Sequence, residues 1–122
     1  MSEKKILIAD DTIEVVNVVE EVLTNAGFKV YKAFDGDEAL SKVWEIKPDL
    51  ILLDVMMPKK NGYDVLNVLK EQPDTQNIPV IMLTGRTGEL DKKISFASGA
   101  DDYIEKPFAV SELLKKVNLF FE

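Results

Sequence analysis

The sequence contains neither cysteine nor histidine. Without cysteine, the chain cannot form disulfides, use a thiol nucleophile or hold a cysteine-ligated zinc or iron–sulfur cluster. Without histidine, it lacks the usual general base, the commonest transition-metal ligand and one member of a Ser-His-Asp triad. Any chemistry must therefore come from carboxylates, lysine, tyrosine and hydroxyl groups.

Long apolar runs and excess positive charge are also missing. No apolar stretch approaches the roughly 18 residues of a membrane span, and the run 6–9 ahead of Asp10 is too short for a signal peptide. The 15 basic and 22 acidic side chains give a net charge of −7, which disfavours binding to nucleic acid or anionic membranes. We expect one cytoplasmic domain, residues 1–122, that contacts neither nucleic acid nor membrane directly.

Short apolar runs predict five strands. Three of them are continuous, at 6–9, 50–53 and 80–83, which is typical of parallel strands covered on both faces. Two weaker runs, 30–33 and 103–105, alternate in part and predict outer strands.

The segments between these strands show helical spacing of apolar residues. The predicted helices are a first one of some fourteen residues that ends at Ala26, then 38–46, 63–70, 90–97, which Gly99 closes, and 111–121. We expect Asp11 to cap the first helix and Gly27 to end it. Strict alternation of strands and helices predicts an α/β fold, a doubly wound parallel sheet with helices on both faces. The pattern by itself leaves the strand order open.

Polar residues end the apolar runs at the edge where open parallel sheets bind ligands. They are Asp10, Asp11, Asp54, Thr84 and Lys106. Taken singly, each fits an ordinary role as a cap, a turn residue or a solvated side chain, but their combination favours a site. Three carboxylates repel one another, and a single lysine cannot balance them, so we expect a hard divalent ion such as Mg²⁺. Carboxylate, metal, lysine and hydroxyl are the groups that phosphoryl transfer uses, with Asp54 as nucleophile.

These residues and their neighbours resemble the receiver domain of bacterial two-component response regulators, in particular the single-domain chemotaxis receivers. The resemblance covers essentially the whole chain. It implies a flavodoxin-like three-layer sandwich with five helices and strand order 2-1-3-4-5. The matching segments are Asp10-Asp11, Asp54-Val55-Met56-Met57-Pro58, Asn61-Gly62, Thr84, Tyr103 and Lys106-Pro107-Phe108.

The resemblance assigns a role to each residue of the acidic cluster. It implies that Asp54 is the phosphorylated residue and that Mg²⁺ is its cofactor. Asp11 and the main-chain carbonyl of Met56 would bind the metal directly alongside Asp54, and Asp10 would act through water.

Four further residues take their roles from the same resemblance. Thr84 resembles the hydroxyl that hydrogen-bonds the phosphoryl group, and Lys106 the cation that pairs with its oxygens. Tyr103 resembles the aromatic residue that turns inward when Thr84 moves. The bond between Lys106 and Pro107 resembles the family's cis peptide.

The resemblance also implies partners. A histidine kinase or histidine phosphotransfer protein would donate the phosphoryl group, and the chain would catalyse only its own Mg²⁺-dependent phosphorylation and dephosphorylation. A downstream protein would bind the face formed by the fourth helix, fifth strand and fifth helix, where Phe96 is a candidate contact. We expect no output domain, because the last predicted helix ends at Phe121.

Several alternatives are weighed against this interpretation. A receiver-shaped interaction module that is never phosphorylated and the excised receiver of a longer DNA-binding regulator both stay open. A phosphatase of the haloacid dehalogenase type usually has a second aspartate two residues after its nucleophile, where this chain has Met56. A dinucleotide-binding domain is disfavoured because no G-x-G-x-x-G follows the first predicted strand.

Overall fold

Five parallel strands form the central sheet of the computed structural model, which describes residues 3–85 and 97–121. The sheet order is β2-β1-β3-β4-β5, so the implied strand order is confirmed. The central strands are almost entirely buried, whereas the two outer strands carry partly exposed polar residues. The strands are β1 (Lys5–Ala9), β2 (Lys29–Ala33), β3 (Leu50–Asp54), β4 (Val80–Thr84) and β5 (Asp102–Glu105).

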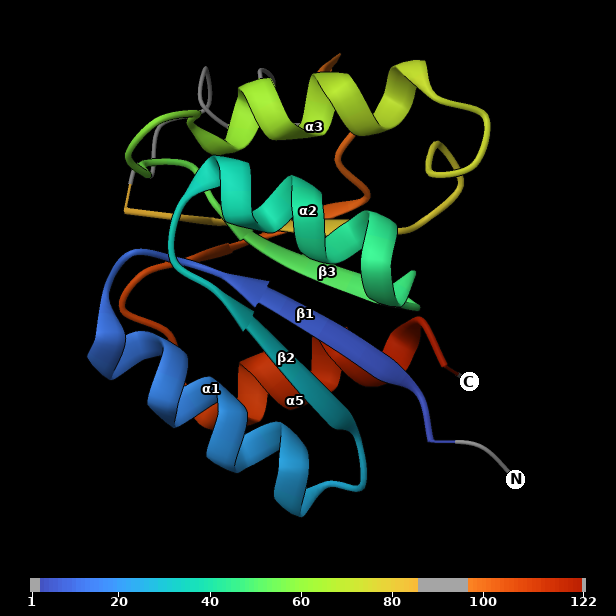
Figure 1. Cartoon of the computed structure of the whole chain (residues 1–122). Helices are drawn as coiled ribbons and strands as arrows, with labels where there is room; N and C mark the ends of the chain where they lie inside the picture. The colour runs from blue at the N-terminus through green and yellow to red at the C-terminus, as the bar shows by residue number, and fades with distance from the viewer. Residues whose placement is uncertain (1–2, 86–96, 122) are drawn as a thin grey trace.

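Helices cover both faces of this sheet, as Figure 1 shows. In the described part of the chain they are α1 (Ile13–Asn25), α2 (Gly36–Ile46), α3 (Gly62–Glu71) and α5 (Val110–Leu119). Helices α1 and α5 contact each other on one face, and α2 and α3 do so on the other. The predicted three-layer α/β architecture is therefore confirmed.

The alternation of side chains along each strand divides the core into two layers. In β1, Ile6 and Ile8 pack with residues of α1 and α5. Leu7 and Ala9 point to the opposite face and pack with residues of α2 and α3. All four side chains are completely buried, so β1 is held between the two helical layers.

The starts of the helices differ slightly from the predictions. Thr12, not Asp11, is the N-cap of α1, and its side chain makes no capping hydrogen bond. Instead, the Asp10 carboxylate accepts a hydrogen bond from the Thr12 N–H at 2.9 Å. Helix α2 begins at Gly36 because the Asp35 side chain accepts from the Glu38 N–H, which caps the helix earlier than predicted.

The predicted fourth helix, 90–97, lies outside the described residues except for its last position, and Phe96 lies outside them too. Gly99, the predicted end of that helix, has a φ of +104°, and Gly27 after α1 has a φ of +99°. Both values belong to the left-handed region that favours glycine.

Two general features complete the fold. The first strand starts at Lys5 and the last helix ends at Leu119, and both positions lie at the edge of the sheet opposite the carboxyl ends of the strands (Figure 1). Among the described helices, none has the length and apolar character needed to cross a membrane.

Candidate functional site

The carboxyl ends of the strands bring the predicted site residues together. Asp54 and Thr84 are the last residues of β3 and β4, Asp10 follows β1 directly, and Lys106 follows β5. Each carboxylate of Asp10, Asp11 and Asp54 offers an oxygen within 4.8 Å of the others. Residues that are far apart in the sequence thus form one acidic cluster.

Lys106 is the cation of this cluster. Its Nζ lies 2.5 Å from Asp10 Oδ2 and 3.2 Å from Asp54 Oδ1. Asp10 is completely buried, and Asp54 is only 5% exposed, whereas Asp11 is exposed to solvent. Among the residues that the structure describes, these two buried carboxylates share one ammonium group, so negative charge exceeds positive charge in this part of the site.

Burial and the neighbouring charges change the acidity of Asp54. Burial, reinforced by the neighbouring charge of Asp10, raises the pKa of Asp54 from 3.8 to about 6, although Lys106 and a backbone hydrogen bond from Met56 act in the opposite direction. Burial also opposes the charge of Lys106. Its hydrogen bond to Asp10 and its attraction to both carboxylates outweigh that effect, so the pKa of Lys106 is raised. Asp54 is thus mainly ionised at neutral pH and remains close to a protonated lysine.

The donor set of the cluster fits a hard divalent cation. Asp10, Asp11 and Asp54 supply only carboxylate oxygens, and the chain contains no histidine or cysteine that would favour a transition metal. Asp11 is exposed to solvent, whereas Asp10 and Asp54 are buried. The three carboxylates present therefore fit a hard divalent cation such as Mg²⁺.

The segment after Asp54 contacts the Asp54 carboxylate through its backbone. The hydrogen bond from Met56 reaches the Asp54 side chain, while the Met56 side chain is 60% exposed. This places the main chain of Met56 beside the acidic cluster. Metal binding by its carbonyl stays a prediction.

The remaining predicted residues lie on β4, β5 and the segment that follows. Thr84 is buried, and its carbonyl accepts a hydrogen bond from the Lys106 N–H at 2.7 Å. Tyr103 is partly buried against the core layer of α2 and α3, and the Lys116 Nζ lies 5.4 Å from its ring centroid. The Lys106–Pro107 peptide bond is cis, so that prediction is confirmed.

A pocket beside Lys106 was not predicted from the sequence. It has a volume of about 420 Å³ and lies between α1 and the segment 106–108. Its lining is mostly apolar and consists of Glu14, Val15, Val18, Lys106, Pro107 and Phe108. Val18 is 47% exposed on α1, away from the buried stripe of that helix. An apolar residue outside the stripe is the signal that could have indicated this surface.

Residues 6–118 match the family model of the response regulator receiver domain. The chain belongs to this family. Its fold, its acidic cluster and the lysine after β5 therefore have a common interpretation as the parts of a two-component receiver.

Individual relatives agree with the family match. The receiver is 47% identical over 113 residues to the transcriptional regulatory protein CpxR of Escherichia coli strain K12, and the match covers 93% of this chain and 47% of CpxR. The chain thus spans about half the length of the curated relatives it matches.

Solved structures give the same result. Chemotaxis protein CheY4 of Vibrio cholerae has a TM-score of 0.92 and 34% sequence identity, covering 98% of this chain and 99% of that one. The BeF3-activated N-terminal receiver domain of Klebsiella pneumoniae RstA has a TM-score of 0.90 and 30% identity, covering 98% and 99%. Receiver domains take phosphoryl groups from histidine kinases, and this chain is a response regulator receiver domain of a two-component system.

Proposed function

We propose that this receiver is phosphorylated on Asp54 by a histidine kinase or a histidine phosphotransfer protein. The observation that carries the proposal is the position of Asp54. Its carboxylate is nearly buried at the end of β3, 3.2 Å from the Lys106 ammonium and within a cluster of three carboxylates. A nucleophilic carboxylate, a fixed cation and a set of oxygen ligands are the groups that phosphoryl transfer requires.

The transfer exchanges one bond to phosphorus for another. A carboxylate oxygen of Asp54 forms the new P–O bond, and the P–N bond to the donor histidine breaks, with its electron pair remaining on the imidazole nitrogen. Asp54 must be ionised to attack, and its pKa of about 6 satisfies this at neutral pH. Lys106 neutralises charge on the phosphoryl oxygens.

Asp11 and Asp54 would hold Mg²⁺, with Asp10 acting through water and the Met56 carbonyl as a further ligand. When bound, the metal supplies positive charge that offsets the negative phosphoryl oxygens. The receiver then catalyses only its own phosphorylation and dephosphorylation.

The output of this site would be a change of protein binding. Thr84 would hydrogen-bond the phosphoryl group, and Tyr103 would turn inward in response, so that phosphorylation shifts the population of two arrangements of the binding face. That face would include β5, α5 and the segment of the predicted fourth helix. Its partner would be a downstream protein in the cytoplasm, with no direct contact to nucleic acid or membrane, in keeping with the net charge of −7.

Intact mass spectrometry tests the phosphorylation directly. The protein is incubated with Mg²⁺ and acetyl phosphate, and separately with a phosphorylated histidine phosphotransfer domain. We expect an added mass of about 80 Da, one phosphoryl unit, that disappears in Asp54→Ala and in EDTA. An equal adduct on Asp54→Ala, or no adduct from either donor on folded protein, would contradict the proposal.

A second candidate concerns the whole protein. Because the matched CpxR is about twice as long as the matched segment and is a transcriptional regulatory protein, the receiver would control a longer transcriptional regulator. An immunoblot of the natural host with an antibody against this domain tests this. A band well above 13.7 kDa favours the longer regulator, and a band at 13.7 kDa contradicts it.

A further inference from the structure

We infer that the first turn of α2 positions the phosphorylation site, through the contact of Gly36 with the segment 55–61 that joins β3 to α3. This inference rests on the proposed function, because that segment carries Met56 and follows Asp54 directly. Gly36 is a positioning residue in this scheme, since it touches the loop and not the reacting atoms.

The contact at Gly36 leaves no room for a side chain. A Cβ atom at this position would lie 2.5 Å from the Lys60 Cβ and closer still to the Lys60 carbonyl oxygen. Both separations are far below van der Waals contact, and the nearest atom belongs to the backbone, which cannot rotate away. The backbone of Gly36 is helical and does not itself need glycine. The close approach of the loop is therefore the reason for glycine here.

Hydrogen bonds fix the same loop at its middle and at its end. The Pro58 carbonyl accepts from the Gly36 N–H at 3.3 Å and from the Lys60 N–H at 2.8 Å. The Gly62 N–H donates to the Val55 carbonyl at 2.8 Å and closes the base of the loop. The loop is thus held between its own base and the start of α2.

Ion pairs reinforce this arrangement only weakly. Lys59 Nζ lies 3.6 Å from Asp35 Oδ2, and Lys60 Nζ lies 3.7 Å from Asp37 Oδ1. The two lysines and Asp37 are substantially exposed, and exposed pairs of this kind contribute little. The close contact of Gly36 with Lys60 is therefore the main constraint that α2 imposes on the loop.

A shift of this loop would reach the site through Met56. A side chain at position 36 would force the Lys60 carbonyl outward, and the loop is only seven residues long from Val55 to Asn61. The Met56 hydrogen bond to the Asp54 carboxylate lies at its start. Some residues orient the ligands of a metal ion without binding the ion themselves. Substituting such residues typically changes the protein's affinity for the metal by about 10- to 100-fold.

The substitution Gly36→Ala tests this positioning. We expect the dissociation constant for Mg²⁺, measured by calorimetry with the metal alone, to rise by about 10-fold or more. In the metal-free protein, the amide NMR resonances of residues 55–57, 59 and 60 should shift. Labelling by acetyl phosphate should slow in parallel with the weaker Mg²⁺ binding.

Gly27→Ala is the matched control. Gly27 has a φ of +99°, and nothing lies within 4 Å of the position that a Cβ would occupy, so alanine there strains the backbone without displacing a neighbour. It should lower stability but leave the Mg²⁺ dissociation constant and the resonances of the loop unchanged. Comparing Gly27→Ala with Gly36→Ala therefore distinguishes a general loss of stability from a displacement of the loop.

A second pair of variants covers the case in which Gly36→Ala does not fold. Lys60→Gly removes the Cβ that lies against Gly36 and should weaken Mg²⁺ binding several-fold. Lys59→Gly removes the same kind of side chain from the preceding position, where the φ of +68° already suits glycine. This control should change the dissociation constant for Mg²⁺ by less than about twofold.

Two results overturn the inference: a folded Gly36→Ala protein with unchanged Mg²⁺ affinity and unshifted loop resonances, or equal effects of Lys60→Gly and Lys59→Gly. Failure of the unaltered protein to bind Mg²⁺ would instead overturn the proposed metal site. The resonances of the metal-free loop would still decide whether Gly36 positions it.

Discussion

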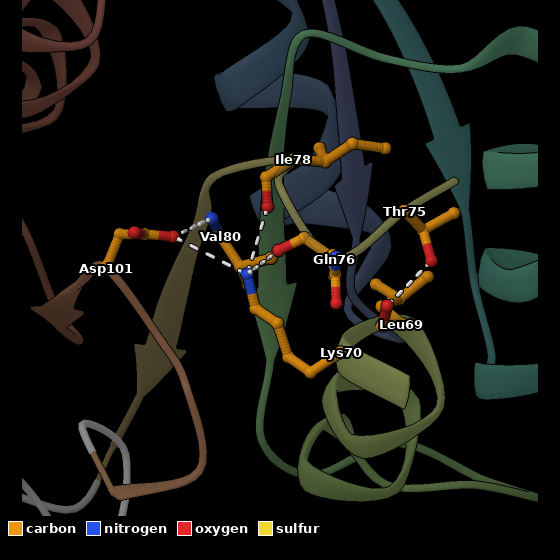
Figure 2. Close-up of polar contacts among 7 residues, drawn as sticks. All are labelled: Leu69, Lys70, Thr75, Gln76, Ile78, Val80 and Asp101. Carbon is orange, nitrogen blue, oxygen red and sulfur yellow. Dashed lines mark hydrogen bonds and ion pairs between the residues drawn. The ribbon is translucent and has the colours of Figure 1, made fainter. Parts of the chain in front are cut away.

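Two lysine-centred networks lie at opposite edges of the same sheet. At the carboxyl edge, Lys106 pairs with Asp10 and Asp54. At the amino edge, Lys70 reaches from α3 to the start of β4 and to Asp101, just before β5 (Figure 2). Both networks use lysine and aspartate, yet their balance of charge is different.

The amino-edge network is built mainly from neutral groups. Lys70 Nζ donates to the carbonyls of Gln76 and Ile78 at 3.0 and 3.3 Å, and lies 4.0 Å from Asp101 Oδ2 (Figure 2). The Asp101 carboxylate accepts from the Val80 N–H at 2.8 Å, and its side chain is 41% exposed. In this network one ammonium group pairs with one carboxylate. That carboxylate is also exposed to solvent and accepts a hydrogen bond from a backbone N–H.

In the described part of the carboxyl edge the balance is different, because one ammonium group pairs with two carboxylates that are nearly inaccessible to water. Neutral carbonyls and solvent satisfy Lys70 and Asp101, so nothing further is needed there. At the other edge the carboxylates of Asp10, Asp11 and Asp54 form a group that could hold a metal ion. The comparison teaches that residue type alone does not distinguish a structural lysine from a functional one, whereas burial and the count of charges do.

The largest expected effect comes from removing Lys106, and the same substitution at Lys70 is its control. Lys106→Ala should slow the phosphorylation of Asp54 by acetyl phosphate about 100-fold, because the phosphoryl oxygens lose their fixed cation. Lys70→Ala should leave that rate within about twofold. The rates are measured by intact mass at saturating Mg²⁺. Similar slowing by both substitutions would remove the functional difference between the networks.

The second prediction uses the pKa of Asp54. Because this pKa is raised from 3.8 to about 6, the folded protein holds the proton more tightly than the unfolded chain. The cost of burying Asp54 is therefore absent below about pH 4 and complete above about pH 6. Asp54→Asn should raise the free energy of unfolding in EDTA by about 2 kcal/mol at pH 7.5, and the gain should vanish near pH 4.

Urea unfolding at several pH values measures this effect. Asp101→Asn provides the control at the amino edge, where the carboxylate is partly exposed and paired with a cation, so no gain is expected. A gain for Asp54→Asn that does not depend on pH would show that ionisation is not its cause.

A smaller effect should follow from the hydrogen bond between Val80 and Asp101. Asp101→Ala leaves the Val80 N–H without its acceptor and should lower the free energy of unfolding by about 1–2 kcal/mol. Asp101→Asn keeps an acceptor oxygen and should cost less than about 1 kcal/mol. Urea unfolding gives both values, and phosphorylation should be unaffected. An equal cost for the two variants would argue against the hydrogen bond as the cause.

The last prediction concerns stabilisation by Mg²⁺. At a concentration ten times its dissociation constant, the metal should raise the free energy of unfolding by about 1.4 kcal/mol. Asp11→Ala should abolish this gain, and the exposure of Asp11 makes the substitution harmless to the core. Asp101→Ala should keep the gain. Stabilisation that survives in Asp11→Ala would place the metal elsewhere.

Much of the fold could be predicted from the order of residues along the chain. The buried runs predicted the strands, because strands covered on both faces are continuously apolar. The resemblance supplied the strand order, which the sheet confirms. The polar residues that end these runs also meet as predicted, since parallel strands bring their carboxyl ends to one edge.

Features that depend on packing between distant segments could not be predicted. Asp10 and Asp11 are adjacent and identical in type, yet one is buried and the other exposed. The buried one, Asp10, is paired with Lys106, which lies nearly a hundred positions away in the sequence. The need for glycine at position 36 likewise comes from the carbonyl of Lys60, and no local pattern around Gly36 reveals it.

The placement of the first strand and last helix has a practical consequence. Strand β1 begins and helix α5 ends at the edge of the sheet opposite the carboxyl ends of the strands (Figure 1). A peptide tag, a fluorescent reporter or a surface tether fused at either end would therefore leave the acidic cluster open to a phosphodonor. Immobilised receiver can accordingly be used to follow the arrival and departure of partner proteins.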